Sequence, residues 1–218
     1  MPDTVDVPWK SIARVWTDAW AAPRFRREVV LTAVAFIGVL NAMARFLNWV
    51  ELRPGVVLPD PVLAAISPRD VTWVTFALVY AGILTTVVVL LPSPRRLLLG
   101  LQSYAVMVLL RMVVMSVTPL EAPPAMIPLQ DPLVQVLGTG QTLTRDLFFS
   151  GHTSTLFLLT LMVPGRRLRA LFLACTIAVG GCVLWQHVHY TVDVLVAPFF
   201  AFAARALAVR LHGRARPG

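Results

Sequence analysis

Two histidines and one carboxylate have the types and surroundings needed for phosphoryl transfer. His189 and Asp193 are four residues apart at the start of an apolar stretch that continues over residues 194–204. In a helix this spacing puts both side chains on one face. An ionisable pair beside a long apolar stretch costs free energy unless it has a function. A second histidine, His152, follows Ser150-Gly151 at the head of another apolar stretch.

These residues fit a reaction that passes through a phosphohistidine. The neutral imidazole of His189 is a nucleophile toward phosphorus, and Asp193 would orient the ring and stabilise the imidazolium that forms. His152 would protonate the leaving oxygen and later deprotonate an acceptor hydroxyl. Arg111 would bind the phosphoryl oxygens. Gly151 would let the backbone at a helix start approach the phosphate. The predicted chemistry uses no cofactor and no metal.

Several of these residues also have structural interpretations. The His189–Asp193 pair is also typical of a polar cap at the end of a membrane helix. His187 and His189 fit part of a metal site, although a clear set of metal ligands is missing. Ser150 lacks the surroundings of a nucleophilic serine and is expected to cap a helix or turn. Asp60 fits a loop between prolines equally well, and Arg45 with Glu51 fits an ion pair.

The candidate binding residues for a phosphorylated substrate share one property, a polar or small side chain near the ends of apolar stretches. Asp146 is a binding residue or a helix cap, and Tyr190 is a substrate contact or an anchor at the membrane interface. Arg111 lies inside an apolar stretch, which favours a function. The full set is Arg111, Asp60, Asp146, Ser150, Gly151, Tyr190 and His187.

The composition is that of an integral membrane protein. Of the 218 residues, 57% are hydrophobic and only 14% are charged, and the mean hydropathy is +0.74, so a soluble domain is excluded. The 19 lysines and arginines outnumber the 11 acidic residues, but they lie between apolar stretches rather than in one patch. This distribution argues against nucleic-acid binding and favours contacts with the bilayer.

The chain divides into three parts. In residues 1–27, tryptophans recur at helical spacing and predict an interfacial amphipathic helix. Residues 28–210 are expected to form one all-α domain with six transmembrane helices, and residues 211–218 a basic cytoplasmic tail. Prolines predict an irregular third connection. Each predicted span is near the length of about 20 residues that crosses a bilayer: 28–50, 72–92, 97–118, 147–164, 168–187 and 190–210.

The distribution of arginines predicts the orientation. The N-terminal segment, the second and fourth connections and the C-terminal tail are basic, whereas the first and third connections are mainly acidic. Both termini should therefore be cytoplasmic. Polar residues from five parts of the chain, Arg45, Asp60, Arg111, His152 and His189, then converge on the exoplasmic or periplasmic side of the cell membrane.

Four blocks of this sequence resemble those of the sphingomyelin synthase-like family, within the type 2 phosphatidic acid phosphatase superfamily. They are Leu58-Pro59-Asp60, the segment from Arg111 to Pro123, residues 146–153 and residues 187–194. The resemblance is to a minimal, bacterial member. It implies a triad of His152, His189 and Asp193.

The resemblance also implies a reaction and its partners. A headgroup such as phosphocholine would pass from a phospholipid donor to a lipid alcohol, ceramide or diacylglycerol, within the bilayer. Thr144-Arg145 stands where the family has Cys-Gly, a departure that bears on headgroup selection. One alternative is a lipid phosphate phosphatase with water as acceptor, although its Lys-x6-Arg-Pro block is missing. Another is a non-catalytic lipid-binding membrane protein. The sequence carries no signal for an oligomeric state.

Overall fold

The computed structural model describes residues 9–130 and 143–214, and within them the chain is all-helical, as expected. The β-type pairing found in these residues is one isolated bridge, between Val56 and Leu120. The helices are α1 (Trp9–Ala21), α2 (Pro23–Glu51), α3 (Pro61–Ala65), α4 (Thr72–Leu90), α5 (Pro94–Val117), α7 (Gly151–Met162), α8 (Arg166–Trp185) and α9 (Thr191–Arg214).

Five helices are long and apolar enough to cross a membrane: α2, α4, α5, α8 and α9. They correspond to five of the six predicted spans. The fourth predicted span, 147–164, contains α7, which has 12 residues. At 1.5 Å per residue this helix reaches about 18 Å, short of the hydrocarbon core of about 30 Å. Residues 147–150 before it are not helical. The count of six spans therefore stays a prediction.

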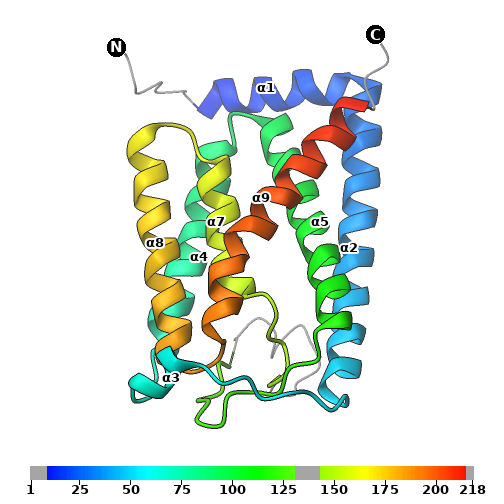
Figure 1. Ribbon diagram of the computed structural model, residues 1–218. Helices are drawn as coiled ribbons and strands as arrows, with labels where there is room; N and C mark the ends of the chain where they lie inside the picture. Colours follow the sequence, from blue (N-terminus) through cyan, green and yellow to red (C-terminus); the bar gives the residue numbers. More distant parts are fainter. Residues whose placement is uncertain (1–8, 131–142, 215–218) are drawn as a thin grey trace.

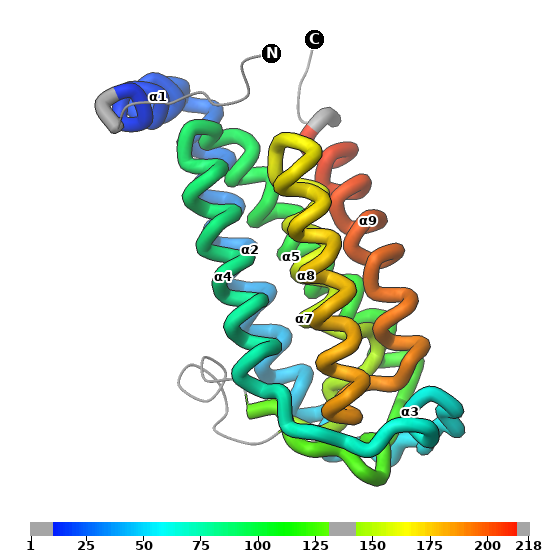
Figure 2. Tube along the Cα trace, turned by 90° about the vertical axis from the view of Figure 1, so that its left-hand side faces the viewer, coloured from blue at the N-terminus to red at the C-terminus, as the bar shows by residue number. Residues whose placement is uncertain are grey.

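The bundle has two distinct ends (Figure 1). The start of α2, the end of α9 and the turns that precede α5 and α8 lie at one end, together with the exposed Arg95, Arg96, Arg166 and Arg167; we call it the arginine end. Helix α1 lies across this end, where Trp16 Nε1 donates to the Leu91 carbonyl at 2.8 Å. The connections that follow α2, α5 and α8 lie at the opposite end, which we call the site end. Figure 2 shows α3 there, beside the lower ends of α8 and α9.

Small residues on α9 allow the central helices to pack closely. Ala197, Ala201 and Ala204 are fully buried and form one cluster with Met107 of α5 and Leu158 of α7. Because an alanine side chain is a single methyl group, the backbones of neighbouring helices come near each other along this stripe. The helices α5, α7 and α9 therefore form a fixed frame for residues at their ends.

Hydrogen bonds tie the connections together at the site end. The first and third connections run side by side, with the Val56 amide donating to the Pro119 carbonyl and the Glu121 amide donating to the Val56 carbonyl, both at 3.0 Å. Gln186, fully buried after α8, accepts from the Val71 amide at 3.2 Å and donates to the Ile127 carbonyl at 3.3 Å. The described part of the third connection is irregular, as its prolines predict.

Candidate active site

His189 and Asp193 lie at the start of α9 and are buried. The distance from His189 Nδ1 to Asp193 Oδ2 is 3.4 Å, longer than an ordinary hydrogen bond of about 2.7–3.2 Å but short enough for the carboxylate to orient the ring. Asp193 Oδ2 also accepts from the Tyr190 amide at 3.0 Å. The other oxygen, Oδ1, is buried without a hydrogen-bond partner among the described residues. An unpaired buried carboxylate oxygen is costly and is typical of a functional group.

The expectation that both residues share one helical face is wrong. Helix α9 begins at Thr191, so His189 belongs to the turn before the helix and Asp193 to its first turn. The chain reverses in this turn at His187, whose φ is 55°, a left-handed conformation that non-glycine residues seldom adopt. The Asp193 carboxylate lies against the His189 ring in the preceding turn, so the two side chains are close although His189 is not part of the helix.

The start of α7 lies against the start of α9. Ser150 precedes α7 as its N-cap, and its hydroxyl accepts from the Thr153 amide at 3.4 Å. The Ser150 amide donates to the carbonyl of Asp193 at 3.1 Å. The bond sets the start of α7 against the start of α9, and His152 lies in that first turn of α7. Its half-buried ring meets Phe76 edge-on, with ring centroids 5.7 Å apart.

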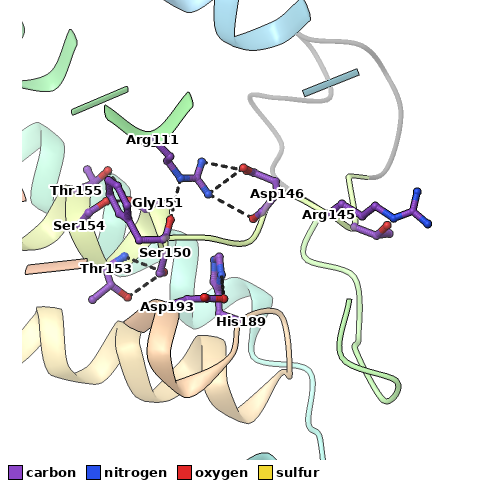
Figure 3. A network of polar contacts seen from close by, with 12 residues as sticks. Arg111, Arg145, Asp146, Ser150, Gly151, Thr153, Ser154, Thr155, His189 and Asp193 are labelled. Carbon is purple, nitrogen blue, oxygen red and sulfur yellow. Dashed lines mark hydrogen bonds and ion pairs between the residues drawn. The ribbon is translucent and has the colours of Figure 1, made fainter. Parts of the chain in front are cut away.

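Arg111, buried on α5, forms hydrogen bonds to the segment that precedes α7 (Figure 3). Its Nε donates to the Phe149 carbonyl at 2.8 Å, and one Nη donates to Asp146 Oδ2 at 3.1 Å. The other Nη lies 2.9 Å from Asp146 Oδ1. Arg111 thus holds the non-helical residues before α7 in place, in addition to bringing a permanent positive charge to the site.

Gly151 allows the guanidinium of Arg111 to lie close to the backbone at the start of α7. A Cβ atom at residue 151 would lie 3.2 Å from Cζ of Arg111, closer than side chains normally pack. Figure 3 shows the Arg111 guanidinium next to Gly151, the first residue of α7. Unpaired N–H groups at a helix start and an arginine form a binding place for an oxyanion. The roles of Arg111 and Gly151 in binding a phosphoryl group stay predictions.

Asp60 contacts backbone rather than the centre of the site. Its carboxylate caps α3 and also accepts from the Thr191 amide at 2.6 Å and the Thr191 hydroxyl at 2.9 Å. Burial, the largest single influence, raises the pKa of Asp60, but the bonds from Thr191, Leu63 and Val62 together leave the pKa below its ordinary value. Asp60 therefore fixes the start of α9, and with it the turn that contains His189.

His187 and Tyr190 have structural partners too. The His187 ring pairs with the Ile66 carbonyl through Nε2 at 3.1 Å. The Tyr190 hydroxyl donates to the Glu121 carbonyl at 2.9 Å and accepts from the Leu58 amide at 3.2 Å. Both residues attach the turn before α9 to the first and third connections. Arg45 is exposed on α2 and does not join the site.

One set of contacts beside the site was not predicted from the sequence. The carboxylate of Glu51 accepts from the Thr144 and Arg145 amides, at 3.0 and 3.1 Å, rather than pairing with Arg45. Glu121 pairs with Arg145 at 2.7 Å. The available signal was the departure at Thr144-Arg145, two charged or hydroxyl-bearing positions where the resembled family has small ones. The partner of Thr144, Glu51, is 93 residues away in the sequence, so local spacing could not predict this contact.

Comparison with known proteins gives a match over the same part of the chain. The family model described as PAP2 superfamily C-terminal matches residues 145–207, a range that contains His152, His189, Asp193 and Asp146. A search of curated proteins finds no match to this chain. Over the segment that carries the two histidines and the aspartate, the chain is similar to the PAP2 superfamily, and this match supports the type 2 phosphatidic acid phosphatase superfamily and a lipid phosphatase or phosphotransferase type of activity.

Proposed function

We propose that the protein is an integral membrane phosphotransferase that moves a phosphorylated headgroup from a phospholipid to a lipid alcohol through a phosphohistidine on His189. The observation that supports it most is the bond from the Ser150 amide to the Asp193 carbonyl at 3.1 Å. This bond places the buried His189–Asp193 pair beside the start of α7, where Arg111 supplies positive charge. A nucleophile, its orienting carboxylate and an oxyanion site are then adjacent.

In the first step, His189 attacks the phosphorus of the donor lipid. Nδ1 faces Asp193, so Nε2 is the nitrogen that is free to react. A bond forms between Nε2 and phosphorus while the bond from phosphorus to the diacylglycerol oxygen breaks, and His152 donates a proton to that oxygen. The Asp193 carboxylate stabilises the positive charge on the phosphorylated ring. Arg111 and the first amides of α7 bind the phosphoryl oxygens.

In the second step, the acceptor alcohol takes the headgroup. His152, now neutral, removes the proton of the acceptor hydroxyl, whose oxygen attacks phosphorus. The bond between phosphorus and Nε2 breaks, and His189 returns to its neutral form. Protons and charges are the same at the end as at the start, so the cycle requires no cofactor.

The burial of the site supports a lipid acceptor. The side chains of His189 and Asp193 are 4% and 0% exposed, and α7 begins inside the bundle, above the lower end of α8 in Figure 1. Bulk water reaches such a site poorly, whereas a hydroxyl on ceramide or diacylglycerol arrives from within the bilayer. The second candidate is a lipid phosphate phosphatase with water as acceptor, which the superfamily match favours.

The proposal includes a placement in the membrane. Six spans would include α7 together with residues 147–150, with the arginine end cytoplasmic and the site end exoplasmic. Helix α1 would lie at the cytoplasmic interface. Its exposed Val15 and Trp20 support this position, because amphipathic interfacial helices bury apolar side chains among lipid headgroups.

Mixed-lipid product analysis tests the function directly. The purified full-length chain is incubated in liposomes with labelled phospholipids, ceramide and diacylglycerol, and the products are identified by mass spectrometry. Transfer of a labelled headgroup to either alcohol, lost in His189→Ala, supports the transferase. Release of inorganic phosphate from phosphatidate without transfer decides for the phosphatase. Full activity in His189→Ala would exclude both proposals.

A further inference from the structure

A second polar cluster, from three separate parts of the chain, lies next to the candidate site. Glu51 is the last residue of α2, Glu121 lies in the third connection, and Thr144 and Arg145 precede α7. We call these four residues the Glu51 clamp. None of them belongs to the predicted triad or to the candidate binding set.

The clamp holds backbone as well as side chains. The Glu51 carboxylate accepts from the Thr144 amide at 3.0 Å, the Arg145 amide at 3.1 Å and the Thr144 hydroxyl. The Arg145 guanidinium donates to the Glu51 carbonyl and pairs with Glu121 at 2.7 Å. A carboxylate that accepts two consecutive amides fixes the path of the chain at those residues.

The residue that follows the clamp in the chain is bound by Arg111. Asp146, the next residue, binds the Arg111 guanidinium through both carboxylate oxygens, at 3.1 and 2.9 Å. Figure 3 shows the Arg145 side chain pointing away from Asp146 and Arg111. The clamp therefore touches no reacting group. It can act on the site only by holding the backbone that presents Asp146.

We propose that Glu51 and the Glu121–Arg145 pair are positioning residues, which hold Asp146 and thereby aim the Arg111 guanidinium at the phosphoryl group. This inference rests on the proposed phosphoryl chemistry. Asp146 and the Phe149 carbonyl occupy several N–H groups of Arg111, so the direction of the remaining donors follows the position of residues 146–149. Release of residues 144 and 145 lets Asp146 shift and turns the guanidinium away from its target.

The test combines Glu51→Gln with a variant at Asp146. A glutamine keeps the shape, but it is neutral and puts an NH2 group in place of one carboxylate oxygen. The Thr144 and Arg145 amides, which share Oε2 of Glu51, therefore both lose a charged partner. Because neutral hydrogen bonds hold these amides less firmly than charged ones, we expect kcat/KM to fall about 10- to 100-fold. Because the clamp acts through Asp146, Glu51→Gln should have almost no further effect in an Asp146→Asn background. Additive losses would overturn the proposal.

A charge exchange provides a second, independent variant. Arg145→Glu should reduce activity by repulsion from Glu121, and the double variant Arg145→Glu with Glu121→Arg should recover most of it. The matched control is Glu28→Gln, which removes the exposed Arg24–Glu28 pair at the other end of α2 and should leave kcat/KM unchanged. Failure of the exchange to restore activity in folded protein contradicts the role of the Glu121–Arg145 pair.

Phosphate binding separates this inference from the proposed function. The thermal shift of the detergent-solubilised full-length chain is titrated with inorganic phosphate, for wild type, Glu51→Gln and Glu28→Gln. Weaker binding in Glu51→Gln alone supports the clamp even where no turnover is found. Equal binding in all three overturns it. His189→Ala should lose turnover but bind phosphate as wild type does. This result would show that phosphate binding and turnover can be measured separately, so a failure of the proposed reaction would not be mistaken for a failure of the clamp.

Discussion

The backbone amide of Ser150 and the backbone carbonyl of Asp193 are joined by a hydrogen bond of 3.1 Å. This bond connects residues 43 positions apart (193 minus 150) and sets the start of α7 against the start of α9. Because it is made by backbone atoms, it survives substitution of either side chain. The triad can therefore be tested by side-chain variants without loss of the framework that holds it.

Asp193→Asn is expected to reduce the rate by at least about 100-fold while the protein still folds. The amide keeps an oxygen for the Tyr190 N–H but loses the charge that stabilises a phosphorylated imidazolium. Single-turnover measurements on purified wild type and variant check this. A variant with more than half of the wild-type rate would show that Asp193 is only a cap for α9.

Gly151→Ala is expected to weaken donor binding, seen as a higher KM, by roughly 10-fold. Its Cβ would lie 3.2 Å from Cζ of Arg111 and would move the guanidinium away from the start of α7. The control is Gly181→Ala, since nothing lies within 4 Å of a Cβ there, and this helical position should gain stability. Equal KM values for the two variants would contradict the close-approach argument.

Arg111→Lys is expected to lose about 100-fold or more in kcat/KM. A lysine ammonium cannot bind the Phe149 carbonyl and both oxygens of Asp146 at once, so the segment before α7 loses its anchor and the site loses a planar donor. Activity assays together with thermal denaturation separate the two effects. Near wild-type activity in Arg111→Lys would reduce the role of Arg111 to that of a point charge.

Asp60→Asn is expected to destabilise the protein at pH 7 but not at low pH. Hydrogen bonds hold the pKa of Asp60 below 3.8 in the folded chain, so the unfolded state binds more protons and the carboxylate stabilises the fold above about pH 4. This stabilisation is lost as the pH falls through the lowered pKa. Melting temperatures from pH 7 to 3 measure it. A constant difference between wild type and variant would show that charge is not involved.

Much of the fold follows from the sequence because the spans are long and uniformly apolar. Helices α2, α4, α5, α8 and α9 each coincide with a predicted span. In the fourth stretch the helix begins later than the predicted span, since Leu147, Phe148 and Phe149 are apolar yet not helical. The Phe149 carbonyl accepts from Arg111 and the Ser150 amide donates to the Asp193 carbonyl, so these groups do not make helical hydrogen bonds. Hydropathy does not reveal such tertiary hydrogen bonds.

The candidate site was predictable only in part, for a related reason. His152, His189 and Asp193 were recognisable from residue type and local spacing. The role of Asp60 was not, because its partner Thr191 is 131 residues away. For Glu51, the sequence offered an ion pair with Arg45 as one structural interpretation, whereas its partners are Thr144 and Arg145. Contacts between distant segments depend on how the helices pack, which one sequence does not specify.

Helix α2 joins the surroundings of the protein to its chemistry. It lies at the edge of the bundle, packs mainly on α5 and turns Val34 and Ile37 outward, so in the proposed placement its neighbours are lipid tails. Such a helix tilts to match the hydrocarbon thickness around it. Its last residue, Glu51, binds the backbone amides of Thr144 and Arg145, so a change in the tilt of α2 would move the backbone that leads to Asp146. The membrane would then act on this protein as a regulator of rate and not only as the store of its substrates.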